Sequence, residues 1–123
     1  DKSKMEELIS FLEETGEHYG YTNYWVAYPL AFQSKETIIY IPALPYHQDL
    51  HYSNRDDRYP PYAEMVKNAK KIAYITSRNP QLEIHLVSMF HERGVSYKTK
   101  HIGDYLIYYD LSNRVDPNDQ TFH

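Results

Sequence analysis

Apolar residues near the start of the chain recur with the period of an α-helix. Between Met5 and Leu12 they are spaced three and four positions apart, which places them on one helical face. Ser3 and Glu6 have the spacing of a capping box, and Gly16 supplies the stop at the other end. The pattern therefore predicts a first helix that is capped by Ser3 and ends before Gly16.

The stretch 20–34, GYTNYWVAYPLAFQS, changes from a strand pattern to a helix pattern and holds the densest run of aromatic residues. Residues 19–21 are typical of the end of a short strand. Thr22 or Asn23 can then accept the unpaired amide protons at the start of a helix over 24–33. This unit predicts a strand that is followed directly by a helix.

Pro29 is the exception within that helix, because it removes one backbone donor and costs about 3 kcal/mol. We expect the helix to be kinked at Pro29 or broken there into two turns. A strand over 24–28 is the alternative, with Pro29 at its edge. In the helical interpretation, the apolar face consists of Val26, Leu30 and Gln33, flanked by Ala27 and Ala31.

The remaining pattern predicts further strands at 37–41, 71–76, 95–101 and 105–110, and helices at 61–69 and 79–94. Residues 102–104 form a turn that joins the last two strands as a hairpin. The residues expected to face inward are Met65, Val66 and Ala69 in one helix and Leu82, Leu86, Met89 and Phe90 in the other. Between 42 and 61 the chain has four prolines and little periodicity, as in a long functional or disordered loop.

Strands separated by helices imply right-handed βαβ crossovers and a parallel sheet that is covered on both faces. The predicted fold class is therefore α/β: a three-layer sandwich around a mostly parallel, Rossmann-like sheet of about five strands, with an antiparallel strand at the edge in a C-terminal hairpin. At 123 residues the chain has room for one core. We expect a single domain over 1–117 and a C-terminal tail over 118–123.

In sheets of this kind, ligands bind beyond the carboxyl ends of the strands. This rule brings together residues 21–25, the loop over 42–61 and residues 76–79, with helix amino termini near Asn23 and Asn79. Such an edge suits an anionic or polyhydroxyl ligand. The candidate ligand-binding residues are Tyr21, Asn23, Trp25, Arg58, Tyr59, Tyr62 and Arg78.

Two of these candidates have a purely structural alternative. Arg58 beside Tyr59 and Tyr62 offers a bidentate fork next to flat apolar faces, the combination that sugars and anionic head groups favour. The alternative is an ion pair of Arg58 with the aspartates at 56–57. For Trp25, the alternative to lining a ligand surface is packing in the core or at its rim.

Signals for other chemistry are weaker. His47 and His51 have the i, i+4 spacing that can hold zinc on a helix, but neither a glutamate between them nor a third ligand is specified. The chain lacks the G-x-S-x-G, G-x-G-x-x-G and Walker sequences. We therefore expect no catalytic residue, no cofactor and no metal site beyond those two candidates. A small hydrolase built on residues 47–57 is a further alternative.

Composition narrows the setting. The net charge is −4 and the 13 lysines and arginines are scattered, so no nucleic-acid surface is expected. No apolar run approaches the roughly 20 residues needed to cross a bilayer, and no signal-peptide core is present, so we expect the chain as given to be soluble. The 14 tyrosines suit half-wet surfaces, because each joins a stiff apolar ring to a polar tip. A chain that begins at Asp1 is interpreted as a fragment or a processed form.

Three segments together resemble a known family: GYTNYWVAYPLAFQSKETIIY, NRDDRYPPY and GVSYKTKHIGDYLIYYDLSNRVDP. In this order they resemble the soluble C-terminal domain of some large bacterial membrane proteins, which are related to glycosyltransferases of the protein-mannosyltransferase and lipid-A aminoarabinose-transferase type. The resemblance extends over residues 17–117. It departs from the family at Pro29, where a polar residue such as arginine is expected.

The resemblance implies an accessory role. In that family the transfer of sugar belongs to the membrane portion, so this domain would be non-catalytic and would lie on the extracytoplasmic side. Its partners would be the membrane-embedded portion of its own polypeptide and a glycan, an acceptor or a lipid-linked sugar. The alternative is a free-standing module that binds carbohydrate or a small anion.

Overall fold

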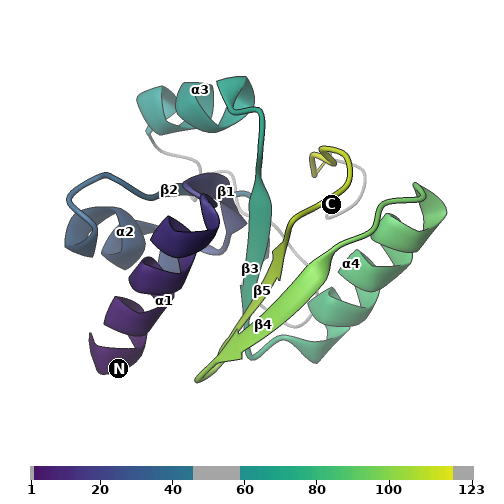
Figure 1. Ribbon diagram of the computed structural model, residues 1–123, viewed down its shortest axis with the longest axis horizontal. Coiled ribbons are helices and arrows are strands. Elements are labelled where there is room, and N and C mark those ends of the chain that lie inside the picture. Colours follow the sequence, from purple (N-terminus) through teal and green to yellow (C-terminus); the bar gives the residue numbers. More distant parts are fainter. Residues whose placement is uncertain (1, 46–58, 118–123) are drawn as a thin grey trace.

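The computed structural model describes residues 2–45 and 59–117 (Figure 1). In this part of the chain the elements follow in the order α1 (Lys2–Thr15), β1 (Tyr19–Thr22), α2 (Tyr24–Gln33), β2 (Ile39–Pro42), α3 (Pro60–Asn68), β3 (Ala73–Ser77), α4 (Pro80–Glu92), β4 (Lys98–Ile102) and β5 (Tyr105–Tyr109). Each of these elements was predicted, with boundaries that differ by a few residues.

The five strands form one open sheet in the order β2-β1-β3-β5-β4. Strand β1 pairs in parallel with β2 and β3, whereas β5 pairs antiparallel with both β3 and β4. The α/β class, the number of strands and the C-terminal hairpin are thereby confirmed. The position of the antiparallel strand was predicted wrongly, because β5 lies inside the sheet and β4 forms its edge.

The burial of the two hairpin strands explains this order. Strand β5 buries Leu106, Ile107 and Tyr108 in succession, whereas residues 98–101 of β4 are all exposed. A strand that is apolar on both faces is stable between two neighbours, and a charged strand protects an open edge from pairing with another chain.

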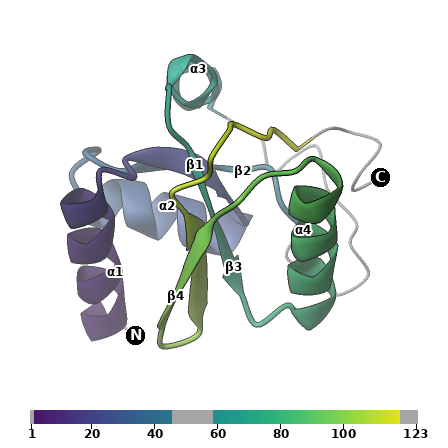
Figure 2. The ribbon, with the colours of Figure 1, turned by 45° about the vertical axis from the view of Figure 1, so that its right-hand side comes forward.

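Two hydrophobic clusters hold the sheet and its helices together. Buried residues of α1 and α2 dominate one cluster, and those of α4, with Val66 of α3, dominate the other. Successive residues of β3 alternate between them: Ala73 and Ile75 belong to the first cluster and Tyr74 to the second. Figures 1 and 2 show α1 and α4 on opposite sides of the sheet, and α3 at one end of it.

Helix α2 is continuous although Pro29 lies within it. The helix prediction is confirmed, whereas the strand alternative and the expected break into two turns are wrong. Val26, Ala27, Leu30 and Ala31 are buried, as predicted, but Gln33 is exposed because it lies at the last position of the helix, next to the turn into β2.

Two smaller predictions about helices are also corrected. Helix α1 already begins at Lys2, so Ser3 lies inside its first turn and cannot be its N-cap. In α3, Val66 is fully buried but Met65 is exposed. The reason is that this nine-residue helix lies at the end of the sheet and buries only a narrow stripe.

Among the residues that the structure describes, no helix is both long enough and apolar enough to span a membrane.

Candidate functional site at the carboxyl edge of the sheet

Two asparagines cap the helices that start at the carboxyl ends of β1 and β3. Asn23 Oδ1 accepts a hydrogen bond from the Val26 amide at 3.1 Å, and Asn79 Oδ1 accepts one from the Leu82 amide at 3.2 Å. Both caps were predicted, and of the two candidates at the start of α2 it is Asn23 that acts. Asn79 also donates to the carbonyl of Pro45, which brings the loop after β2 to the same edge.

A hollow of about 410 Å³ opens at this edge. It is lined by residues from the starts of α1 and α2, the end of β3 and the β4–β5 turn. These residues are Lys4, Asn23, Trp25, Val26, Ser77, Arg78, Gly103, Asp104 and Tyr105. The sequence-predicted candidates Asn23, Trp25 and Arg78 are therefore brought together.

Trp25 contributes an exposed aromatic ring to the hollow. It lies in the first turn of α2 and its side chain is 64% exposed. The Tyr24 ring contacts the indole edge to face, with 5.3 Å between the ring centroids. Trp25 therefore lies on the surface, so packing in the core is wrong, whereas packing at the rim and lining a ligand surface both stay predictions.

Arg78 and Asp104 form the charged part of the hollow. Arg78 Nη2 lies 2.5 Å from Asp104 Oδ2, and both side chains are largely exposed. The hydrogen bond from Arg78 holds the pKa of the Asp104 carboxyl below its ordinary value of 3.8. Arg78 itself has a φ of 51°, in the left-handed region that residues other than glycine adopt rarely. The chain therefore turns sharply directly after β3, at Arg78, whose side chain lines the hollow at the carboxyl edge of the sheet.

The contributions of the β4–β5 turn and of Lys4 to this hollow were not predicted from the sequence. The turn lies here because β4 runs in the same direction as β1 and β3, so that its carboxyl end reaches the same edge. Gly103 has a φ of 57°, and a Cβ on it would lie 3.1 Å from Lys4 Cγ. The charged residue Asp104 within a Gly-Asp turn was a signal, but only the strand order shows where it lies.

Tyr21 lies apart from this hollow, although it was predicted with the others. Its ring is buried against Tyr74, with 5.4 Å between centroids. Its hydroxyl donates to Asp116 Oδ1 at 2.8 Å and accepts from Arg114 Nη2 at 3.0 Å. Burial, followed by the hydrogen bond to Asp116, raises the pKa of Tyr21 to about 12. Tyr21 thus secures the segment after β5.

Tyr59 and Tyr62 lie in a different place, between α2 and α3. Both line a second hollow of about 590 Å³, together with Tyr28, Ala31, Phe32, Lys35 and Glu36. The candidate site predicted from the sequence is therefore divided between two hollows, one at the start of α2 and one along its later turns. Arg58, His47 and His51 lie outside the described residues.

Two titratable side chains of the carboxyl-edge hollow have shifted pKa values. Within it, Asp104 is held in its ionised form, and burial, followed by the charge of Asp104, raises the pKa of Tyr105. Neither shift brings a group towards neutral pH, where acid and base catalysis requires it. No group of three or more residues of the metal-binding types occurs in the part of the chain that the structure describes.

Comparisons with known proteins identify no relative. No family model matches the chain, and neither a curated protein nor a solved structure is significantly similar to it.

Proposed function

We propose that this chain is a non-catalytic domain that binds a glycan in the carboxyl-edge hollow. The observation that carries the proposal is the position of the exposed Trp25 ring beside the Arg78–Asp104 pair, within one hollow of about 410 Å³. This volume falls in the range of small-ligand sites.

The three side chains match the two kinds of surface that a sugar presents. One face of a pyranose ring carries C–H groups, which pack on a flat aromatic ring such as the indole of Trp25. Its hydroxyl groups need paired donors and acceptors, which the guanidinium of Arg78 and the carboxylate of Asp104 supply in fixed directions. The positive charge of Lys4 is offset by Glu7, whose Oε1 lies 3.5 Å from Lys4 Nζ, and that of Arg78 is offset by Asp104, so charge alone favours neither an acidic nor a basic sugar.

The wider setting is also a proposal. The resemblance in the sequence supports an accessory domain of a membrane glycosyltransferase, on the extracytoplasmic side, in contact with the membrane portion of its own polypeptide. The two hydrophobic clusters around the sheet support the finer fold prediction of a three-layer, Rossmann-like sandwich. The gene can decide between this setting and a free-standing module: many apolar spans encoded upstream of Asp1 are expected for the accessory domain, and a reading frame of only this length would exclude it.

The binding proposal is tested by amide NMR during titration with short neutral and acidic oligosaccharides and with polyprenyl-phosphate head-group analogues. We expect the shifts to cluster in residues 23–26, 77–78 and 103–105. Shifts that cluster elsewhere, or none at millimolar ligand, would reject the carboxyl-edge hollow as a glycan site.

A further inference from the structure

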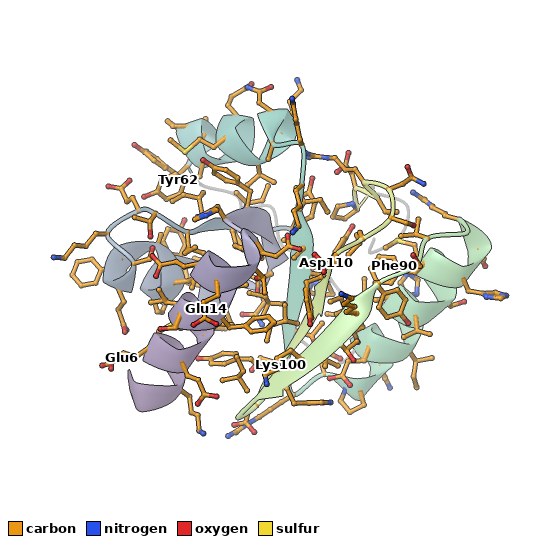
Figure 3. The ribbon with its side chains drawn as sticks, viewed as in Figure 1. Glu6, Glu14, Tyr62, Phe90, Lys100 and Asp110 are labelled. Carbon is orange, nitrogen blue, oxygen red and sulfur yellow. The ribbon has the colours of Figure 1, made fainter. Side chains whose placement is uncertain are left out.

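The second hollow, between α2 and α3, lies apart from the proposed glycan site and is lined mainly by aromatic side chains. We call it the aromatic hollow and define it by Tyr28, Ala31, Phe32, Lys35, Glu36, Tyr59 and Tyr62. Four of these seven residues are aromatic, and together the seven line a hollow of about 590 Å³. Figure 3 shows Tyr62 below α3, on the side of that helix that faces α2.

Two of the rings are nearly perpendicular to each other. Tyr59 and Tyr62 pack edge to face, with 4.4 Å between centroids and an angle of 83° between their planes. Phe32 on the α2 side is 84% exposed. The face of an aromatic ring carries partial negative charge, so rings in such an arrangement attract a cation that has lost its water.

A carboxylate lies beside these rings. Glu36 Oε2 accepts a hydrogen bond from the Tyr62 hydroxyl at 2.6 Å. This hydrogen bond, followed by burial, raises the pKa of Tyr62 to about 12, so the phenol remains a neutral donor at physiological pH. The bond fixes the carboxylate against the aromatic wall and leaves its negative charge at the hollow.

Glu36 also decides which class of ligand suits the hollow. A purely apolar ligand would strip water from the carboxylate without replacing it, and an anion would be repelled. A neutral sugar needs several hydrogen-bonding groups, whereas most of this lining is apolar. Lys35 also lines the hollow, and its positive charge opposes a cationic ligand from the end of a flexible stem.

We propose that the aromatic hollow binds a quaternary ammonium group, with the rings of Phe32, Tyr59 and Tyr62 as its walls and Glu36 as its counter-charge. Such a group has no N–H to donate and a weakly hydrated, methyl-covered cation, which aromatic faces and one carboxylate can satisfy together. The ligand class includes choline, betaine-type head groups and trimethylated lysine side chains.

The proposal is tested by calorimetric titration of the whole chain with choline and with its uncharged carbon isostere, dimethylbutanol. The two probes have nearly the same shape and differ in charge. We expect choline to bind with a dissociation constant in the millimolar range or below, at least about tenfold tighter than the isostere. Equal affinities would show an unspecific apolar hollow, and no binding of choline would also overturn the proposal.

Variants with opposite expected effects make the test sharper. Glu36→Gln should weaken choline binding about tenfold, and Lys35→Gln should tighten it, because each removes one charge from the same wall. Phe32→Ala should weaken it several-fold. All three side chains are exposed, so the fold should survive the changes.

The matched control is Ile84→Ala, which removes an apolar side chain that is 72% exposed on α4 and lines neither hollow. It should leave the affinity for choline unchanged. A loss in Ile84→Ala equal to that in Phe32→Ala, or an unchanged affinity in Glu36→Gln, would contradict the proposal.

Discussion

The fully buried carboxylate of Glu17 accepts a hydrogen bond from the backbone amide of Asp110, with 2.8 Å between Oε2 and the nitrogen. This contact joins the turn after α1 to the end of β5, where Figure 3 labels Asp110. Lys71 Nζ lies 3.4 Å from Glu17 Oε2 and 3.0 Å from Asp110 Oδ1. Among the described residues, Glu17 Oε1 has no hydrogen-bond partner. Burial outweighs the favourable contacts and raises the pKa of Glu17 above 4.5.

This raised pKa predicts a pH dependence of stability. The folded state holds the Glu17 proton more tightly than the unfolded state does, so the free energy of unfolding falls as the pH rises from 4.5 through the folded-state pKa. Glutamine does not titrate. We therefore expect the stability of Glu17→Gln, relative to the natural chain, to increase between about pH 4 and pH 7 in urea denaturation.

The neighbouring aspartate acts in a different pH window. The hydrogen bond from Lys71 holds the pKa of Asp110 below 3.8. The stabilising contribution of the Asp110 carboxylate is therefore lost only as the pH falls below 3.8, through the folded-state pKa.

One outcome would contradict the prediction for Glu17. If the Glu17→Gln variant lost stability relative to the natural chain between about pH 4 and pH 7, the role assigned to burial would be wrong.

Gly20 allows β1 to lie close to its neighbours. A Cβ at this position would lie 2.0 Å from the Ala73 carbonyl oxygen and 2.5 Å from Tyr40 Cε2. Gly20→Ala should therefore cost several kcal/mol, enough to unfold a marginally stable domain. Gly16→Ala is the control: nothing lies within 4 Å of its Cβ, and its φ of 73° should cost only about 1 kcal/mol. Circular dichroism melts of both variants measure the difference, and equal melting temperatures would contradict the account.

Arg114 fastens the segment after β5 to the end of α3. Its Nη1 donates to the carbonyls of Val66 and Ala69, and its Nε lies 2.7 Å from Asp116 Oδ1. The single ammonium group of a lysine cannot donate to both carbonyls and to Asp116 at the same time. Arg114→Lys should therefore lower the free energy of unfolding by about 1 to 3 kcal/mol. Urea denaturation measures this loss. Arg93→Lys, at an exposed arginine, should change it by less than about 0.5 kcal/mol.

Arg78 should separate binding from stability. Its φ of 51° suits glycine, and its ion pair with Asp104 is exposed, so Arg78→Gly should leave the melting temperature nearly unchanged. The same change removes the guanidinium from the glycan hollow, and affinity for oligosaccharide should fall about tenfold or more. A large loss of stability would show instead that Arg78 is mainly structural. Parallel thermal melts and calorimetric titrations distinguish these outcomes.

The local parts of the fold could be predicted because local rules govern them. The Asn23 cap fixes the start of α2, and the helix tolerates Pro29 because Val26 and Leu30 bury their side chains on either side of it. The apolar face of α4 was also predicted correctly, because its buried residues follow the helical period. Tertiary geometry decides the rest: Met65 is exposed because α3 lies at the end of the sheet.

The candidate site was predicted only in part, because strand order decides which residues meet. The contrast between KTKHI in β4 and YLIYY in β5 marks β4 as the edge strand, and this signal is present in the sequence. From the strand order that this contrast implies, Asp104 could have been predicted to lie near Asn23. The separation of Tyr62 from Trp25 depends on where α3 packs, and helical periodicity carries no information about that.

Trp25 is proposed to form the platform of the glycan site. Calorimetric titration of Trp25→Ala with the oligosaccharide that gives the largest NMR shifts tests it most directly, with Ile84→Ala as the control for removal of an exposed apolar side chain. We expect affinity to fall about tenfold or more in Trp25→Ala and to be unchanged in Ile84→Ala, with both variants folded. Unchanged affinity in Trp25→Ala would contradict the assignment of the carboxyl-edge hollow as the glycan site.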